Sequence, residues 1–197
     1  LDEETARADL YGLLAQLYYA PAPELLAALR SAPVEAPAAG GFLEAPWRAL
    51  VQTAQALGDA QVAEEHEALF GGLGQPEVYL FGSHYLTGFL NERPLARLRE
   101  DLAGLGLARD ETLPETEDHF ACVCEVMRYL IAGEDVAVSN LTRQREFFAA
   151  HVQPWALSMC EALAAHRSAR FYAALAGFTQ AFLEVEQQGF DMLDGQA

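Results

Sequence analysis

Apolar residues recur along most of the chain with the period of an α-helix. The first such segment spans residues 3–20, and Pro21 ends it. Its apolar side chains fall on one helical face: Ala6, Leu10, Leu13, Leu14 and Leu17.

The same period predicts further helices at residues 23–31, 45–57, 59–70, 94–105, 115–132, 139–152, 154–166 and 168–188. In the last of these, a buried face is expected from Phe171, Leu175, Phe178, Phe182 and Val185. Gly189 follows this helix and is interpreted as its C-cap. No stretch shows sustained alternation with period two. We therefore expect an all-α fold, a single irregular bundle of about nine helices over residues 1–197.

Two connections interrupt the bundle. The glycine run Gly71–Gly74 ends one helix, and residues 106–114 form a second break that we interpret as a candidate hinge. Between them, residues 75–92 are rich in aromatic side chains and nearly free of charge. We expect a loop and a short helix there. We also expect a functional surface, because aromatic side chains in a loop are typical of binding sites.

The charge of the chain narrows the classes of partner. Its 52% hydrophobic content excludes a disordered chain, and its net charge of −17 disfavours binding to nucleic acid or anionic lipid. All basic residues are arginine, which excludes a P-loop lysine or a Schiff-base lysine. A basic partner would be attracted instead.

The sequence also bears on the compartment. No uncharged run reaches the roughly 20 apolar residues of a membrane span, and the N-terminal residues are acidic, unlike a secretory signal. The chain has three cysteines, an odd number that does not favour a disulfide framework. We expect a cytoplasmic protein without stable membrane insertion.

Catalytic and metal-binding patterns are weak. Cys122 and Cys124 point roughly 200° apart on a helix and cannot share an ion. No histidine follows an acid by three residues, as a di-iron bundle requires, and no Gly-x-Ser-x-Gly turn is present. We expect no catalytic residues, no cofactor and no metal.

The acidic segment Thr112–His119 is the most informative stretch. Thr112 and Glu115 fit a capping box, and acids in a first turn complement the helix dipole. Continued as a helix, the segment places Asp118, Glu125 and Tyr129 on one face. Such a face suits a ligand that is both basic and apolar.

Several motifs in order resemble one family. They are Glu65-His66-Glu67-Ala68-Leu69-Phe70, a loop with Pro76, Tyr79, Ser83 and Tyr85, the motif Glu115-Thr116-Glu117-Asp118-His119 with Thr116 in place of proline, the helix Phe120–Leu130, and Phe147-Phe148 with His151, Pro154 and Trp155. Over roughly residues 10–185, the chain is similar to the TorD/DmsD/NarJ-type chaperones of redox enzymes.

This resemblance implies a function. Such chaperones bind the twin-arginine signal peptide and the apo form of a molybdoenzyme, of the dimethyl sulfoxide, trimethylamine oxide or nitrate reductase or formate dehydrogenase type. They delay export until the molybdenum cofactor is inserted. The expected signal-peptide-binding residues are Leu69, Phe70, Tyr79, Ser83, Tyr85, Glu115, Glu117, Asp118 and His119.

The residue types agree with that role. Two adjacent arginines are best bound by paired carboxylates, and an apolar stretch by a groove between helices. One alternative is a small helical nucleotide-binding or nucleotide-hydrolysing protein, and another is a helical scaffold that only dimerises. The sequence leaves open whether the chain is a monomer or a homodimer, which client it serves, whether a guanine nucleotide binds, and whether the client's mature core is also contacted.

Overall fold

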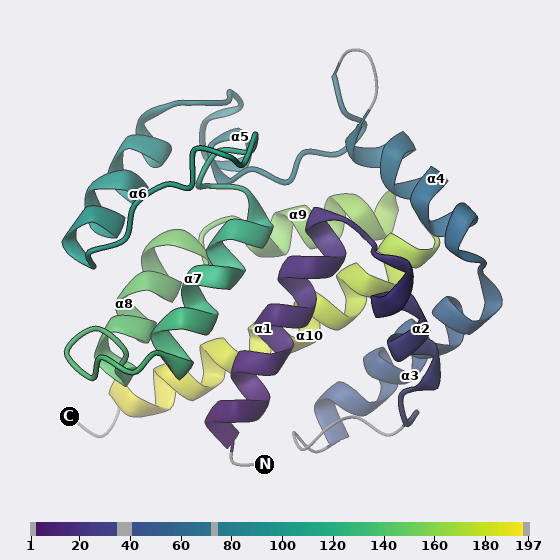
Figure 1. Ribbon diagram of the computed structural model, residues 1–197, viewed down its shortest axis with the longest axis horizontal. Coiled ribbons are helices and arrows are strands. Elements are labelled where there is room, and N and C mark those ends of the chain that lie inside the picture. Colours follow the sequence, from purple (N-terminus) through teal and green to yellow (C-terminus); the bar gives the residue numbers. More distant parts are fainter. Residues whose placement is uncertain (1–2, 35–40, 72–74, 195–197) are drawn as a thin grey trace. The chain divides into compact units, whose positions relative to one another are not determined.

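The computed structural model describes residues 3–34, 41–71 and 75–194, and their regular structure is helical (Figure 1). The predicted all-α class is confirmed. These residues form ten helices, of which the shortest, α5 (Gly82–Thr87), lies in the aromatic segment where a short helix was expected. The glycines at 72 and 74 lie outside the described residues.

The chain divides into two compact units, each built from two separate stretches. The first unit comprises residues 19–79 and 157–194, and the second comprises residues 3–18 and 80–156. The connection at residues 106–114 lies inside the second unit. A single domain over residues 1–197, with a hinge at this connection, stays a prediction.

The first unit is built around the long helix α10 (Phe171–Asp194), drawn in yellow in Figure 1. It packs against α3 (Gly41–Ala56), where the ring centroids of Trp47 and Phe178 lie 5.3 Å apart. Its other helices are α2 (Pro23–Ser31), α4 (Asp59–Phe70) and α9 (Ala156–Ala165), whose first residue lies across the boundary. The buried face of α10 is confirmed at Phe171, Leu175, Phe178 and Phe182, while Val185 is half-buried.

Glu65 on α4 holds the start of α10. Its carboxylate accepts hydrogen bonds from the backbone N–H groups of Arg170 at 2.8 Å, Phe171 at 3.1 Å and Tyr172 at 2.8 Å. The first N–H groups of a helix have no partner within the helix, and a carboxylate both satisfies them and complements the helix dipole. Glu65 therefore caps the N-terminus of α10 from another helix, in place of a neighbouring residue in the sequence.

The second unit contains α1 (Glu3–Tyr19), α5, α6 (Arg93–Gly104), α7 (Phe120–Ala132) and α8 (Leu141–His151). Helices α7 and α8 lie side by side (Figure 1). Phe120 lies at the centre, with its ring 5.0 Å from that of Tyr18 and 5.8 Å from that of Trp155. The Gln144 amide donates to the carbonyl of Leu130 at 3.2 Å and accepts from Arg7 at 3.1 Å, which ties together α1, α7 and α8.

Helix α7 begins at Phe120 and not at residue 115, so the capping box at Thr112 is wrong. The Thr112 N–H and hydroxyl donate to Asp110 instead, at 2.9 and 2.6 Å. The cap is His119, whose Nδ1 accepts from the N–H of Ala121 at 3.1 Å. Asp118 therefore precedes the helix and does not share a helical face with Glu125 and Tyr129.

At the other end of the chain, α10 continues to Asp194, so the interpretation of Gly189 as a C-cap is wrong. A glycine is tolerated inside a helix at a cost of about 1 kcal/mol relative to alanine. The apolar period resumes at the buried Phe190, and packing of that side chain favours continuation. Across the described residues, no helix combines the length and the apolar character that a membrane crossing requires.

Replacement of Glu65 by alanine tests the cap on α10. We expect the free energy of unfolding to fall by about 1–2 kcal/mol, because three N–H groups, two of them in partly buried bonds, lose their acceptor. Denaturant unfolding followed by circular dichroism measures this. The neighbouring exposed Glu64→Ala should change the free energy by less than about 0.5 kcal/mol. Equal effects of the two substitutions would contradict the capping role.

Candidate functional site

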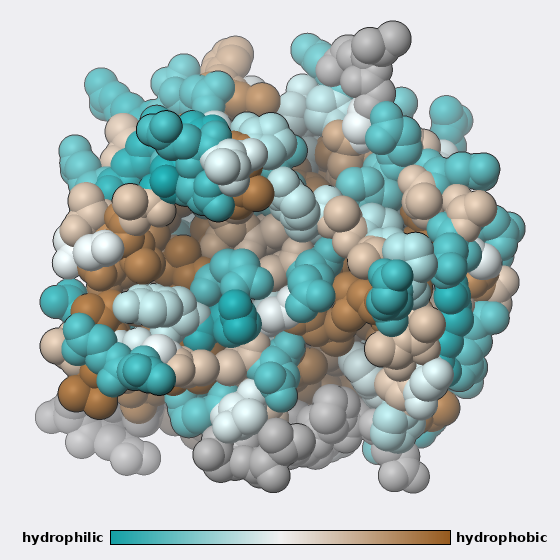
Figure 2. Space-filling model, viewed as in Figure 1, coloured by the Kyte–Doolittle hydropathy of each residue, from teal (hydrophilic) through white to brown (hydrophobic). Residues whose placement is uncertain are grey.

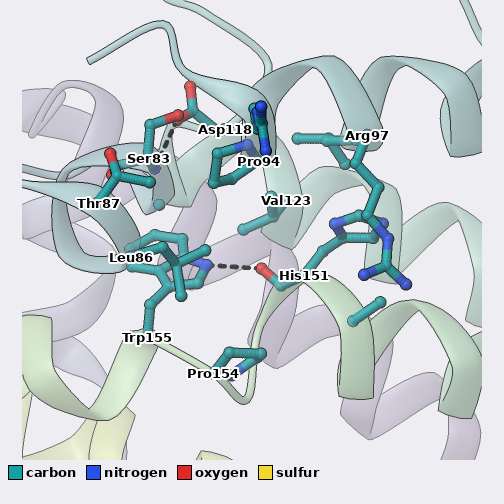
Figure 3. A pocket seen from close by; sticks show the side chains of 14 residues that line it. Ser83, Leu86, Thr87, Pro94, Arg97, Asp118, Val123, His151, Pro154 and Trp155 are labelled. Carbon is teal, nitrogen blue, oxygen red and sulfur yellow. Dashed lines mark hydrogen bonds between the residues drawn. The ribbon is translucent and has the colours of Figure 1, made fainter. Parts of the chain in front are cut away.

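The second unit encloses a cavity of about 460 Å³. Figure 3 shows its lining, in which Leu86, Val123 and Trp155 lie between Thr87 on one side and Arg97 on the other. Its walls come from α5, the first half of α6, the start of α7 and the turn after α8. The lining is mainly apolar, with a few polar groups at its edge, as is typical of ligand-binding sites.

The buried carboxylate of Asp118 fixes one wall of the cavity. Asp118 is only 4% exposed, and its Oδ2 accepts from the Ser83 N–H at 2.9 Å and from the Ser83 hydroxyl at 2.5 Å. Its Oδ1 accepts from the Thr116 hydroxyl at 2.6 Å. A buried charge must be satisfied in this way, because removal from water without hydrogen bonds costs several kcal/mol.

Backbone pairing reinforces this link. Phe81 and His119 form an isolated antiparallel bridge, in which Gly82 N–H donates to the Asp118 carbonyl at 2.9 Å and Phe120 N–H donates to the Leu80 carbonyl at 2.8 Å. The His119 ring packs edge-on against Phe81 at 5.0 Å. The segment before α7 is therefore fastened to the start of α5.

Trp155 forms the apolar floor of the cavity and is held from several sides. Its Nε1 donates to the His151 carbonyl at 2.7 Å, a bond drawn in Figure 3, and the Tyr85 ring stacks on it at 5.9 Å. A Cβ atom at Gly82 would lie 2.9 Å from this Nε1. Glycine at this position thus permits α5 to approach the indole.

The opposite wall carries positive charge. Arg93 and Arg97 lie four residues apart on α6, which places them on one helical face, and both line the cavity. Next to them, His151 Nε2 lies 2.7 Å from Asp101 Oδ2. Burial lowers the pKa of His151, and the hydrogen bond to Asp101 offsets this effect only in part.

Carboxylates gather near the start of α7, around Cys122. Burial, and then the charges of Glu115, Glu117, Asp118 and Glu125, raise the pKa of the Cys122 thiol to about 11. We call these four residues the acidic cluster. Glu117 is bonded to Arg99 through both oxygens, at 2.9 and 2.8 Å. Burial opposes the ionisation of Glu117, but these bonds outweigh it, and its pKa is lowered.

The predicted binding residues divide between the two units. The second unit contains Ser83, Tyr85, Glu115, Glu117, Asp118 and His119. The remaining three, Leu69, Phe70 and Tyr79, belong to the first unit, where Leu69 is fully buried and Phe70 packs edge-on against Tyr172 at 4.8 Å. The role of all nine in binding stays a prediction.

The sequence interpretation missed Arg93 and Arg97. Their spacing of four residues, with Pro94 in the first turn, was the available signal. A metal site was not expected, and no group of three or more metal-binding side chains occurs in the residues that the structure covers. All three cysteines are free thiols.

Comparison with known proteins identifies a family. A family model described as nitrate reductase delta subunit matches residues 37–161, which is more than half of the chain. This stretch includes every residue that lines the cavity and all four residues of the acidic cluster. A search of curated proteins found no match.

Replacement of Asp118 by asparagine tests the buried anchor. We expect a loss of about 2 kcal/mol in the free energy of unfolding, because a neutral amide oxygen accepts more weakly and its NH₂ group faces donors. Urea unfolding measures this. The control Glu134→Gln replaces an exposed acid and should stay within about 0.5 kcal/mol of the parent protein. A stability of Asp118→Asn as high as that of the control would disprove the anchor.

Thiol alkylation tests the acidic cluster. We expect Cys122 to react slowly with iodoacetamide at pH 8, with a rate that rises toward a pKa of about 11, because the thiolate is the nucleophile. Combined Glu115→Gln and Glu125→Gln substitutions remove two negative charges, lower this pKa and raise the rate at pH 8. Peptide mass spectrometry locates the adduct. An unchanged rate, as expected for Glu134→Gln, would show that these acids do not act on Cys122.

Proposed function

This chain belongs to the nitrate reductase delta subunit family, the NarJ/TorD-type chaperones of molybdoenzyme maturation, and we propose that its second unit binds the twin-arginine signal peptide of its client. The family is non-catalytic, and the chain acts as a chaperone and not as an enzyme. The observation that carries the proposal is the group of carboxylates at the start of α7, where Glu115 is half-buried and the Glu125 side chain is exposed and paired only with the exposed Arg128.

The acidic cluster supplies carboxylates for the arginine pair of the signal peptide. Glu115 is half-buried, and none of the hydrogen bonds or salt bridges described above uses its carboxylate. Glu125 is bound to Arg128 at the surface at 2.8 Å, and exposed pairs of this kind are weak enough to be exchanged for a ligand. Guanidinium groups bind carboxylates through two parallel hydrogen bonds, which favours a site with several acids over a single one.

Ser83, Asp118 and His119 act in this proposal as positioning residues. The bond from Ser83 to Asp118 and the His119 cap on Ala121 place the start of α7, and so hold Glu115 and Glu117 in front of it. Asp118 contributes charge from below the surface, since its own oxygens are occupied by Ser83 and Thr116.

The apolar part of the signal peptide needs an exposed apolar surface. Leu86, Phe89 and Leu90 follow one another around the end of α5, with exposed fractions of 42%, 69% and 41%. Tyr85 lies beside them, half-buried. We propose that these side chains contact the apolar stretch.

Binding of this kind holds the client back. We propose that the chain acts in the cytoplasm, where it retains the apo-molybdoenzyme until the client's own molybdenum cofactor is inserted. The net charge of −17 raises the association rate of a basic peptide. A free energy of about 8–9 kcal/mol, which corresponds to a micromolar to sub-micromolar dissociation constant, permits both capture and release.

Calorimetric titration with a twin-arginine signal peptide tests the proposal. We expect the dissociation constant to rise with salt, and to rise about tenfold or more in the double variant Glu115→Gln/Glu125→Gln, because charge-assisted bonds are lost. Tyr85→Ala should weaken binding through its apolar contact. Glu134→Gln serves as the control, and circular dichroism must show that each variant is folded.

The arginines of the peptide provide the decisive comparison. A signal peptide in which both arginines are glutamine should bind far more weakly than the natural one. Equal binding of the two peptides would contradict the acidic-cluster site, whatever the variants show.

A further inference from the structure

The acidic cluster already holds a guanidinium group that belongs to the chain itself. Arg99, an exposed residue of α6, donates to both carboxylate oxygens of Glu117, from Nε to Oε1 at 2.9 Å and from Nη2 to Oε2 at 2.8 Å. A ligand arginine would form the same fork with a carboxylate. Figure 2 shows a hydrophilic surface, in teal, in the region where Figure 1 places α6 and the connection that leads from it to α7. Arg99 therefore occupies a place that a ligand arginine could take.

The two partners of this ion pair differ in exposure. The Arg99 side chain is 46% exposed, whereas the Glu117 side chain is only 12% exposed while Arg99 covers it. Arg99 can turn into water at little cost, but Glu117 would then be a largely buried carboxylate without a partner. Departure of Arg99 is therefore favourable only when another guanidinium group replaces it. A ligand arginine can reach Glu117 only by this exchange.

The surroundings of Glu117 identify the group that has to move. Among the described residues, no ion pair uses the carboxylate of Glu115, so a first ligand arginine can bind there without displacing a side chain. Arg109 acts on Glu117 through its charge, while its guanidinium group donates to the Leu113 carbonyl at 3.2 Å. Arg99 is thus the cation that a second ligand arginine must replace.

Attachment to the same chain makes Arg99 an effective competitor. A side chain fixed beside its partner acts at an effective concentration on the order of millimolar, far above that of a free ligand. An isolated arginine from solution therefore does not displace Arg99. A ligand arginine whose neighbour is already bound to Glu115 is held in place as well, and the two competitors then become comparable.

We propose that Arg99 is an internal competitor of the signal peptide, which occupies Glu117 in the free protein and is displaced by one of the two adjacent arginines of the ligand. The exchange breaks one forked ion pair and forms another, so the second arginine adds little net affinity. The return of Arg99 to Glu117 favours release of the ligand. This inference rests on the proposed function, and it adds a residue of α6 that sets how tightly the signal peptide is held.

Calorimetric titration of Arg99→Gln with the twin-arginine signal peptide tests this competition. We expect the dissociation constant to fall about tenfold relative to the parent protein, because the second arginine gains an ion pair without the loss of another. A peptide in which glutamine replaces either one of the two arginines should bind the variant and the parent protein alike. Arg99→Lys, which keeps the charge but not the fork, should give a smaller gain in affinity.

Matched variants separate competition from a general effect of charge. Arg143→Gln changes the net charge by the same amount and removes the exposed salt bridge to Glu146 on α8, at 3.1 Å. It should leave the dissociation constant within about twofold of the parent value, because distant surface charges are screened. The double variant Arg99→Gln/Glu117→Gln should lose the gain in affinity, which completes a double-mutant cycle. Glu117→Gln alone should bind like the parent protein, since it removes the exchange as a whole.

The results distinguish this inference from the proposed function. Binding by Arg99→Gln or Arg99→Lys that is unchanged or weaker, in variants that circular dichroism shows to be folded, would overturn the role of Arg99. An equal gain for the peptide with one arginine, or in Arg143→Gln, would overturn it as well. If Glu115→Gln/Glu125→Gln still weakened binding in these cases, the acidic cluster would stand without an internal competitor. Absence of binding to the parent protein and to Arg99→Gln would overturn both proposals.

Discussion

A single buried carboxylate organises the second unit. Asp118 is almost completely removed from water, so its charge must be matched by hydrogen bonds, and the structure supplies them from Ser83 on one side and Thr116 on the other. Because a buried carboxylate without hydrogen bonds would be costly, the bonds from Ser83 hold the start of α5 against the segment before α7. The shape of the cavity and the position of the acidic cluster both follow from that constraint. In the first unit Glu65 does comparable work on α10, with three N–H groups as its partners.

Charge is sorted within the second unit despite the excess of acid in the chain. Carboxylates gather around Cys122, and the two arginines of α6 face the cavity. Asp118 belongs to both places, since it lines the cavity and also acts on Cys122.

The helices could be predicted from sequence because packing of an apolar face is a local periodic signal. The buried face of α10 is an example, with Phe171, Phe178 and Phe182 all at the expected spacing. The start of α7 could not, because the partner that removes Asp118 from the helix is Ser83, which lies 35 residues earlier. Likewise, Leu69 and Phe70 were recognised by motif, but only coordinates show that the first unit buries Leu69. Within the described residues Arg97 has no carboxylate partner, because Asp101, one helical turn further on, is bonded to His151 instead. A contact between α6 and α8 cannot be predicted from the sequence pattern of α6 alone.

The chain has two tryptophans, and each unit holds one of them. Trp47 packs on α10 in the first unit, and Trp155 floors the cavity in the second, pressed against Gly82 and stacked with Tyr85. The fluorescence emission of an indole changes with its surroundings. If one tryptophan is replaced, the remaining tryptophan fluorescence reports on the other unit alone. The protein thus carries its own pair of optical reporters, one for the integrity of each half and one of them seated where a ligand would arrive.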